Sequence, residues 1–198
     1  MNQKQVWDNI AQEWYEFKTE PAEHTLEFLK NKTGNILDFG SGAGRNLLNI
    51  NHGEMYLVDF SEKMIKLAKK RAKEKNIKAE FFLSRLTKLP FSDNFFDFAI
   101  AVASLHCIKG QKNREKAVKE LFRVLKSGAE AEISVWNKQS KTFKNSPKEK
   151  YIAWHDKGKR YYYLFDEKEV HNLFKSTGFK IKKKFEPRRN IIFIVEKL

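Results

Sequence analysis

The chain has 198 residues, 41% of them hydrophobic and 14% aromatic, which predicts one domain of ordinary size with a packed core and excludes a disordered chain. The single cysteine, Cys107, excludes an intramolecular disulfide and a cysteine-based metal site, and it indicates a reducing, cytoplasmic setting. The longest nearly apolar run, 98–108, is too short to span a membrane. The net charge of +14 is unevenly distributed along the chain. Residues 1–135 have 22 basic and 18 acidic side chains, whereas residues 136–198 have 17 basic and 7 acidic ones. This excess of positive charge favours a polyanionic partner for the last third of the chain.

Segments with the pattern of strands and of helices alternate along the chain. Short apolar runs predict strands over 35–39, 55–59, 78–83, 95–103, 129–136, 179–185 and 190–196. Helical spacing of apolar residues predicts helices over 4–17, 23–31, 61–74, 113–125 and 166–176, with Ser61 and Asp166 as N-caps and Gly128 as a stop. The short connection 186–189 makes the last two strands antiparallel, so the pattern predicts a doubly wound α/β sheet with an antiparallel edge pair.

We interpret residues 1–198 as a single domain with two additions to this sheet. Residues 1–33 form the N-terminal helices, in which Trp7, Ile10, Ala11 and Trp14 share one face. That face either packs on the sheet or closes over a ligand as a lid. Residues 137–165 are basic and aromatic without a clear period, which predicts an insertion on the substrate side.

The sharpest motif is a glycine loop that follows the first predicted strand. The strand runs into Gly40, Gly42 and Gly44 and then into a predicted helix, so the backbone can turn tightly and approach a ligand closely. The spacing G-x-G-x-G differs from the nicotinamide fingerprint and from the phosphate P-loop. Asp38 suits a cation such as the ammonium of an amino acid, and Asp59, which ends the second strand, suits both hydroxyls of a ribose. S-adenosylmethionine (SAM) has both groups and no phosphate.

The run ILDFGSGAGR (36–45), with LVDFS (57–61), LPF (89–91) and FDFAIAV (96–102), resembles the class I SAM-dependent methyltransferases. The resemblance covers nearly the whole chain. It implies a seven-stranded Rossmann-like sheet with an antiparallel last strand, SAM as the cofactor and no metal. By position it implies that these residues bind the cofactor: Asp38, Gly40, Gly42 and Gly44 at the methionine end, Asp59 at the ribose, and Ser61, Met64, Arg85, Leu86 and Ala103 around the rest.

The sequence departs from this family at one cofactor position. Many relatives carry an aspartate that accepts the adenine amine, and Arg85 stands in its place. Because an arginine cannot accept a hydrogen bond, the backbone of Leu86 and apolar contacts are expected to hold the adenine instead.

A closer resemblance concerns the acceptor. FDFAIAVASLHCI (96–108) and the segment RYYYLF (160–165) are similar to the tRNA wobble-uridine carboxymethyl methyltransferases, the tRNA methyltransferase 9 family, in a compact archaeal-type form. The resemblance implies methyl esterification of the carboxylate of 5-carboxymethyluridine at wobble position 34. It also implies the tRNA anticodon stem-loop as a partner and a small zinc-binding activator subunit. Cys107 reads as a small buried hydrophobe.

A carboxylate acceptor is already anionic at neutral pH and needs no general base. His106 follows the fourth predicted strand at the ligand edge of the sheet and is either a structural histidine or part of the acceptor pocket. Arg160 and Tyr162 are expected to hold the acid, and Trp136 or a tyrosine of 161–163 to stack on the uracil. The basic residues expected to contact phosphates are Lys138, Lys141, Lys144, Lys148, Lys150, Lys182, Lys183, Lys184, Arg188 and Arg189.

Two other functions are compatible with the same fold. One is a methyltransferase that acts on a small molecule, such as a quinone or a metabolite acid. The other is a catalytically inactive RNA-binding scaffold, which Arg85 in place of the aspartate favours.

Overall fold

The computed structural model describes residues 2–198, and seven strands of this range form one sheet in the order β3-β2-β1-β4-β5-β9-β8. The strands are β1 (Gly34–Phe39), β2 (Gly53–Asp59), β3 (Ala79–Leu83), β4 (Phe96–Val102), β5 (Leu125–Trp136), β8 (Phe179–Lys184) and β9 (Asn190–Lys197). The helices are α1 (Gln3–Phe17), α2 (Glu23–Leu29), α3 (Glu62–Glu74), α4 (Gln111–Val124) and α5 (Glu167–Lys175), with a 3₁₀ turn η1 (Leu105–Cys107). No helix within residues 2–198 is long and apolar enough to cross a membrane.

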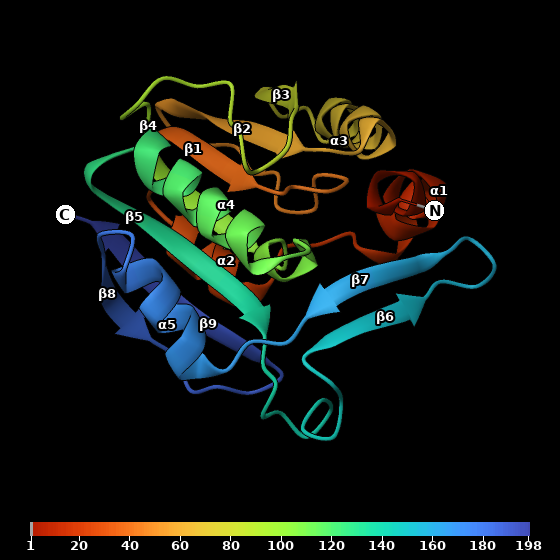
Figure 1. Ribbon diagram of the computed structural model, residues 1–198. Coiled ribbons are helices and arrows are strands. Elements are labelled where there is room, and N and C mark those ends of the chain that lie inside the picture. The colour runs from red at the N-terminus through yellow and green to blue at the C-terminus, as the bar shows by residue number, and fades with distance from the viewer. Residues whose placement is uncertain (1) are drawn as a thin grey trace.

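Helices cover both faces of the sheet (Figure 1). Successive strand residues point to opposite faces, so Leu37 and Phe39 join the core with α4 and α5, whereas Ile36 joins the core with α2 and α3. β1, β2, β4 and β5 run parallel, and their carboxyl ends meet at one edge of the sheet. That edge lies beneath α1.

The structure confirms the predicted fold class. The last two strands form the expected hairpin at the edge, and the antiparallel strand β9 is inserted between β5 and β8. Ser61 caps α3 as predicted, since its hydroxyl accepts a hydrogen bond from the Met64 amide at 3.2 Å. Gly128 does not stop α4, which ends at Val124. It lies inside β5, where the register with β4 shifts.

The helix predicted after the glycine loop is wrong. The chain beyond Gly44 makes only turns, with bonds from Gly44 N–H to the Ser41 carbonyl (3.1 Å) and from Leu47 N–H to the Gly44 carbonyl (3.2 Å). Gly44 has a φ of +72°, which a right-handed helix cannot include. The few residues left before β2 are too short a stretch to offset the cost of helix nucleation.

The insertion contains a hairpin that the sequence did not predict, formed by β6 (Glu149–Ala153) and β7 (Lys159–Tyr163). Residues 160–163 of β7 are all buried. Tyr161 and Tyr163 face the α4 side, and Tyr162 packs with α1. A strand that is buried on both faces shows no alternation of polar and apolar residues, so its sequence has no two-residue period. The hairpin reaches toward α1 (Figure 1).

Candidate active site

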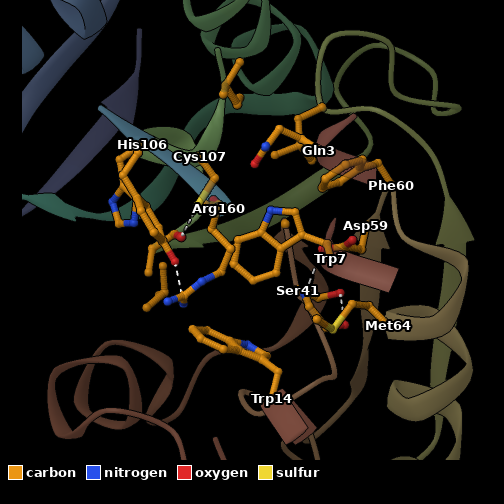
Figure 2. Close-up of a pocket in the computed structure, with 18 of the residues that line it drawn as sticks. Gln3, Trp7, Trp14, Ser41, Asp59, Phe60, Met64, His106, Cys107 and Arg160 are labelled. Atoms are coloured by element: carbon orange, nitrogen blue, oxygen red, sulfur yellow. Dashed lines mark hydrogen bonds between the residues drawn. The ribbon is translucent and has the colours of Figure 1, made fainter. Parts of the chain in front are cut away.

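A cavity of about 790 Å³ lies at the carboxyl edge of the sheet, roofed by α1 and the β6–β7 hairpin (Figure 2). This is where open α/β sheets bind their ligands, and the volume suits a cofactor with part of a second substrate. The predicted site residues that line it are Gly40, Gly42, Asp59, Met64, Arg85, Leu86, Ala103, His106, Trp136, Arg160 and Tyr162. Asp38, Gly44, Ser61, Lys182 and Arg188 are not part of its lining.

The glycine loop leaves its backbone accessible at Gly42. Gly40 and Gly42 have φ angles of +85° and +54°. A Cβ at Gly40 would lie 2.4 Å from the Ser104 Cβ, so this glycine is needed for close packing. A Cβ at Gly42 would meet only the Trp14 indole nitrogen at 3.8 Å, which means that open space adjoins this peptide. A ligand can therefore lie directly against the loop.

Asp38 lies buried behind the loop. Its Oδ2 accepts a hydrogen bond from the Asn46 amide at 3.4 Å, and its Oδ1 has no partner within residues 2–198. Burial raises the pKa of Asp38 to about 7, although Asn46 and the charge of Arg45 oppose the shift. A cation bound near the loop would stabilise the ionised carboxylate.

Asp59 is held by the backbone around it. Its two oxygens accept hydrogen bonds from the Gly42 and Ser61 amides, each at 2.9 Å. Burial raises the pKa of Asp59 to about 6 against the effect of these donors. The Phe60 amide also acts on this carboxylate, which lines the cavity and, because it only accepts hydrogen bonds, suits the hydroxyls of a ligand. With the open loop and the unpartnered oxygen of Asp38, these residues fit SAM.

Met64, Arg85 and Leu86, which are predicted to surround the adenine, line the cavity. Ser61 does not line it, because its hydroxyl also donates to the Asp8 carboxylate at 2.6 Å and so ties α1 to α3. Ala103 has a φ of +58°, a strained angle for a residue with a side chain, at the point where β4 gives way to the cavity wall.

Arg160 is the most unusual residue of the cavity (Figure 2). It is only 7% exposed, yet no carboxylate within residues 2–198 pairs with it. Its Nη1 donates to the Tyr162 hydroxyl at 2.8 Å, and its Nε has no partner in the same range. Aromatic rings surround the guanidinium: its carbon lies 4.6 Å from the Trp154 centroid and 5.4 Å from that of Trp14. A buried, unpaired cation in a cavity is suited to an anionic ligand.

His106 is buried and neutral. Burial lowers its pKa to about 3, and its Nδ1 accepts a hydrogen bond from the Trp136 amide at 3.1 Å, which leaves the proton on Nε2. Trp136 stacks on both Tyr162 (4.2 Å between centroids) and Phe143 (4.8 Å). These rings therefore form one rigid wall.

Two basic residues predicted to contact substrate lie outside the cavity. The Lys182 ammonium pairs with Glu130 at 2.7 Å and with Glu196 at 3.5 Å. Arg188 is exposed beside the mouth, where the neighbouring Arg189 lines the cavity instead. No group of His, Cys, Asp and Glu side chains in the described part of the chain is suited to a metal.

Sequence reasoning did not name the three residues of the aromatic cage as site residues. Trp7 and Trp14 were predicted to share a helix face that either packs on the sheet or closes over a ligand, and both line the cavity, whereas Trp154 was not singled out. The structure brings all three around Arg160. The available signal was the concentration of tryptophan, since three of the four in the chain form this cage.

Comparisons with known proteins agree with this geometry. Residues 37–132 match the family model described as a methyltransferase domain. The chain is 27% identical to the tRNA (carboxymethyluridine(34)-5-O)-methyltransferase of Schizosaccharomyces pombe, over 98% of this chain and 95% of that protein. A SAM-dependent methyltransferase of Methanosarcina mazei superposes with a TM-score of 0.72 at 24% identity, over 90% of this chain and 99% of that one.

A further structure is a complex between the Haloferax volcanii Trm112 methyltransferase activator and a methyltransferase. It matches with a TM-score of 0.75 at 14% identity, over 98% of this chain and 95% of that one. The methyltransferase-domain match over residues 37–132, the class I, Rossmann-like fold and a cavity whose residues fit the cofactor together support a SAM-dependent methyltransferase.

Proposed function

We propose that this enzyme methylates the carboxylate of 5-carboxymethyluridine at wobble position 34 of tRNA. The observation that carries the proposal is Arg160, a buried guanidinium without a carboxylate partner in residues 2–198, in the same cavity as the glycine loop and Asp59. A guanidinium binds a carboxylate through two parallel hydrogen bonds, which also fixes its orientation. The relative from S. pombe has a name that states this reaction.

The residues of the cavity suit a reaction that requires alignment and no proton transfer. SAM, when bound, supplies an electrophilic methyl group. Arg160 holds the acceptor carboxylate, and the rings of Trp7, Trp14 and Trp154 exclude water from it, so the acid loses hydration that would shield its oxygens. His106 stays neutral and keeps the Trp136 wall in place through its Nδ1.

The uracil would stack on the cage near Arg160. Trp136 already stacks on Tyr162 and Phe143, whereas the cage rings make edge-to-face contacts, with 5.6 Å between the Trp14 and Trp154 centroids. Trp14 and Trp154 both line the cavity. Stacking on aromatic rings is the usual way in which proteins hold an unstacked base.

An activator subunit would pair with the free edge of β3. This strand ends the sheet order, and its last residue, Leu83, is 54% exposed. An open strand edge beside an apolar side chain is a template for strand pairing. Leu83→Lys is expected to weaken a complex with a small zinc-binding subunit in size-exclusion chromatography and to leave SAM binding unchanged.

A nucleoside-level assay tests the reaction. The enzyme, with and without the activator, is incubated with labelled SAM and tRNA that carries 5-carboxymethyluridine, and the same tRNA with unmodified uridine 34 is the control. An alkali-labile methyl ester at position 34 of the first tRNA only is the expected product. Label at another position of tRNA would overturn the carboxylate chemistry. Transfer to a quinone or a metabolite acid but not to tRNA would show a small-molecule methyltransferase.

A further inference from the structure

Two loops lie side by side (Figure 1), and the cavity lining includes Trp136, directly before the first loop, and Arg189, at the end of the second. One is 137–148, which follows β5, and the other is 185–189, which joins β8 to β9. The Asn137 backbone amide donates to the Arg189 carbonyl at 3.0 Å, and its side-chain amide donates to the Arg188 carbonyl at 2.9 Å. These bonds hold the loops in a fixed relation. We call the surface that they share the basic rim, made of Lys138, Lys141, Lys144, Arg188 and Arg189.

The basic residues of the last third differ in whether a carboxylate neutralises them. Lys148 pairs with Asp166 and Glu169, each at 2.8 Å, and the ammonium of Lys182 pairs with Glu130. No residue of the basic rim pairs with a carboxylate within residues 2–198. All five rim residues belong to the last third of the chain, where the charge excess lies. Lys183 and Lys184 of β8 are also exposed and pair with no carboxylate within residues 2–198, so the rim is distinguished by its position beside the cavity and not by the lack of partners alone.

The rim is continuous with the cavity. The guanidinium carbon of Arg189 lies 5.8 Å from the ring centroids of Trp136 and Phe143, and Arg189 and Trp136 both line the cavity. Lys18 at the end of α1 and Arg45 also line the cavity with Arg189, and burial together with the charges of Arg45 and Arg189 lowers the pKa of Lys18. Lys141 and Lys144 are exposed on the outer side.

We propose that the basic rim is the surface that binds the RNA phosphate backbone, with Arg189 at its inner end beside the nucleotide that enters the cavity. This inference rests on the proposed function for the identity of that nucleotide. Unpaired Lys and Arg side chains on two loops can each neutralise a phosphate and release a counterion, whereas Lys148 and Lys182 would first have to leave their carboxylates. The rim residues thus combine two properties, the lack of a carboxylate partner within residues 2–198 and a position on the two loops beside the cavity.

Two double variants test the rim. Each removes two lysines and therefore the same charge, so that one serves as the matched control of the other. Lys141→Ala/Lys144→Ala removes unpaired rim charges, and Lys148→Ala/Lys182→Ala removes ion-paired ones. Filter binding measures the Kd for a tRNA transcript between 0.05 and 0.3 M salt, and calorimetry measures SAM binding. The rim variant is expected to raise the tRNA Kd about 10- to 30-fold near 0.15 M salt and to lower the slope of log K against log salt by about 1.5 to 2. The control variant is expected to change neither by more than about twofold.

Equal losses in the two variants would show a general charge effect and overturn the rim, and so would no loss in either. Binding to vesicles with 30% anionic lipid that falls in the rim variant, while tRNA binding does not, would assign the rim to a membrane surface instead. Because RNA binding is measured without methyl transfer, a rim effect on tRNA with no methylation at position 34 would overturn the proposed reaction and leave the surface standing. Arg188→Ala, measured in the same way, is expected to lower the slope of log K against log salt by about 1, the effect of one lost phosphate contact.

Discussion

Arg160 gives the sharpest test of how this cavity works, because its substitution is predicted to lower activity strongly and to leave stability nearly unchanged. In the absence of substrate its guanidinium is buried, and within residues 2–198 it has one hydrogen bond, to Tyr162, and no carboxylate. Arg160→Met keeps most of the volume and removes the charge. The variant should lose the acceptor and keep the fold.

The magnitude follows from the contacts. Removing one partner of a buried charge pair costs about 2–5 kcal/mol, so kcat/KM for the carboxymethyl tRNA should fall about 30- to 1,000-fold or more. The substitution has two opposing effects on the free energy of unfolding. Loss of the Tyr162 hydrogen bond and of the ring contacts destabilises the fold by a few kcal/mol. Removal of a buried charge that has no carboxylate partner stabilises it by a similar amount. The free energy of unfolding should therefore stay within about 1 kcal/mol of the parent.

The assay compares initial rates of methyl transfer from labelled SAM with the midpoint of urea unfolding. Arg114→Met is the matched control, since Arg114 is also buried but lies outside the cavity lining, where it donates to the Ile108 carbonyl at 3.1 Å. That control should lose stability. SAM affinity should be unchanged in Arg160→Met, because we propose Arg160 for the acceptor and not for SAM.

Two outcomes would refute this reasoning. If Arg160→Met unfolds more easily by more than about 3 kcal/mol, the guanidinium is a structural group and its activity loss is uninformative. If the variant folds normally and methylates the carboxymethyl tRNA with an unchanged KM and kcat, the carboxylate does not bind there.

Four further predictions concern single residues. Because burial raises the pKa of Asp38 to about 7 and a cationic ligand favours its ionised form, SAM affinity measured by calorimetry should rise from pH 6 to pH 8, and Asp38→Asn should flatten that rise. Asp59→Asn should weaken SAM binding about tenfold or more in the same measurement, since an amide can accept from only one of two hydroxyls; an unchanged Kd would exclude the ribose role. His106→Asn keeps an acceptor for the Trp136 amide, so the pH profile of kcat/KM for tRNA at saturating SAM should have the same shape between pH 5 and 8 in both enzymes; a limb lost on substitution would contradict the neutral histidine. Ala103→Gly relieves the φ of +58° and should raise the melting temperature by roughly 2–4 °C, whereas a fall would show that the angle is not strained.

Most of the fold could be predicted because its signals are local. The hydrophobic periodicity predicts which helix faces pack on the sheet, and the caps at Ser61 and Asp166 predict where two helices begin. The Glu169 side chain accepts a hydrogen bond from the Asp166 backbone amide at 3.3 Å, as a capping box requires. The hairpin of the insertion could not be predicted. Its strand β7 is buried on both faces by contacts with segments far away in sequence, such as Gln3, whose side chain accepts from the Tyr161 amide at 2.8 Å.

Some residues of the candidate site could be predicted from the sequence and others could not. The positions of Gly40, Gly42 and Asp59 in the cavity could be predicted from their spacing alone, because the carboxyl ends of parallel strands meet at one edge of the sheet. The role of Lys182 depends on the register of β8 against β9, which sets it beside Glu196 and within reach of Glu130. Pairing between strands is not encoded in the local sequence, so ion-paired and free lysines looked alike.

The titratable groups of the cavity also distinguish between acceptor classes. Methylation of a neutral carbon or hydroxyl requires removal of a proton, and therefore a base with a pKa near neutrality. His106 uses its Nδ1 on the Trp136 amide and carries its proton on Nε2, and burial raises the pKa of Cys107 and of Tyr162 above their usual ranges, so none of the three serves. Asp38 and Asp59 have pKa values of about 7 and about 6, but we propose both for the cofactor and not for the acceptor. A carboxylate acceptor needs no base, and it supplies the negative charge that Arg160 lacks. A quinone acceptor would lack a group that removes its proton, whereas a carboxylate acceptor requires no such group. We therefore favour the carboxylate of a modified wobble uridine as the acceptor.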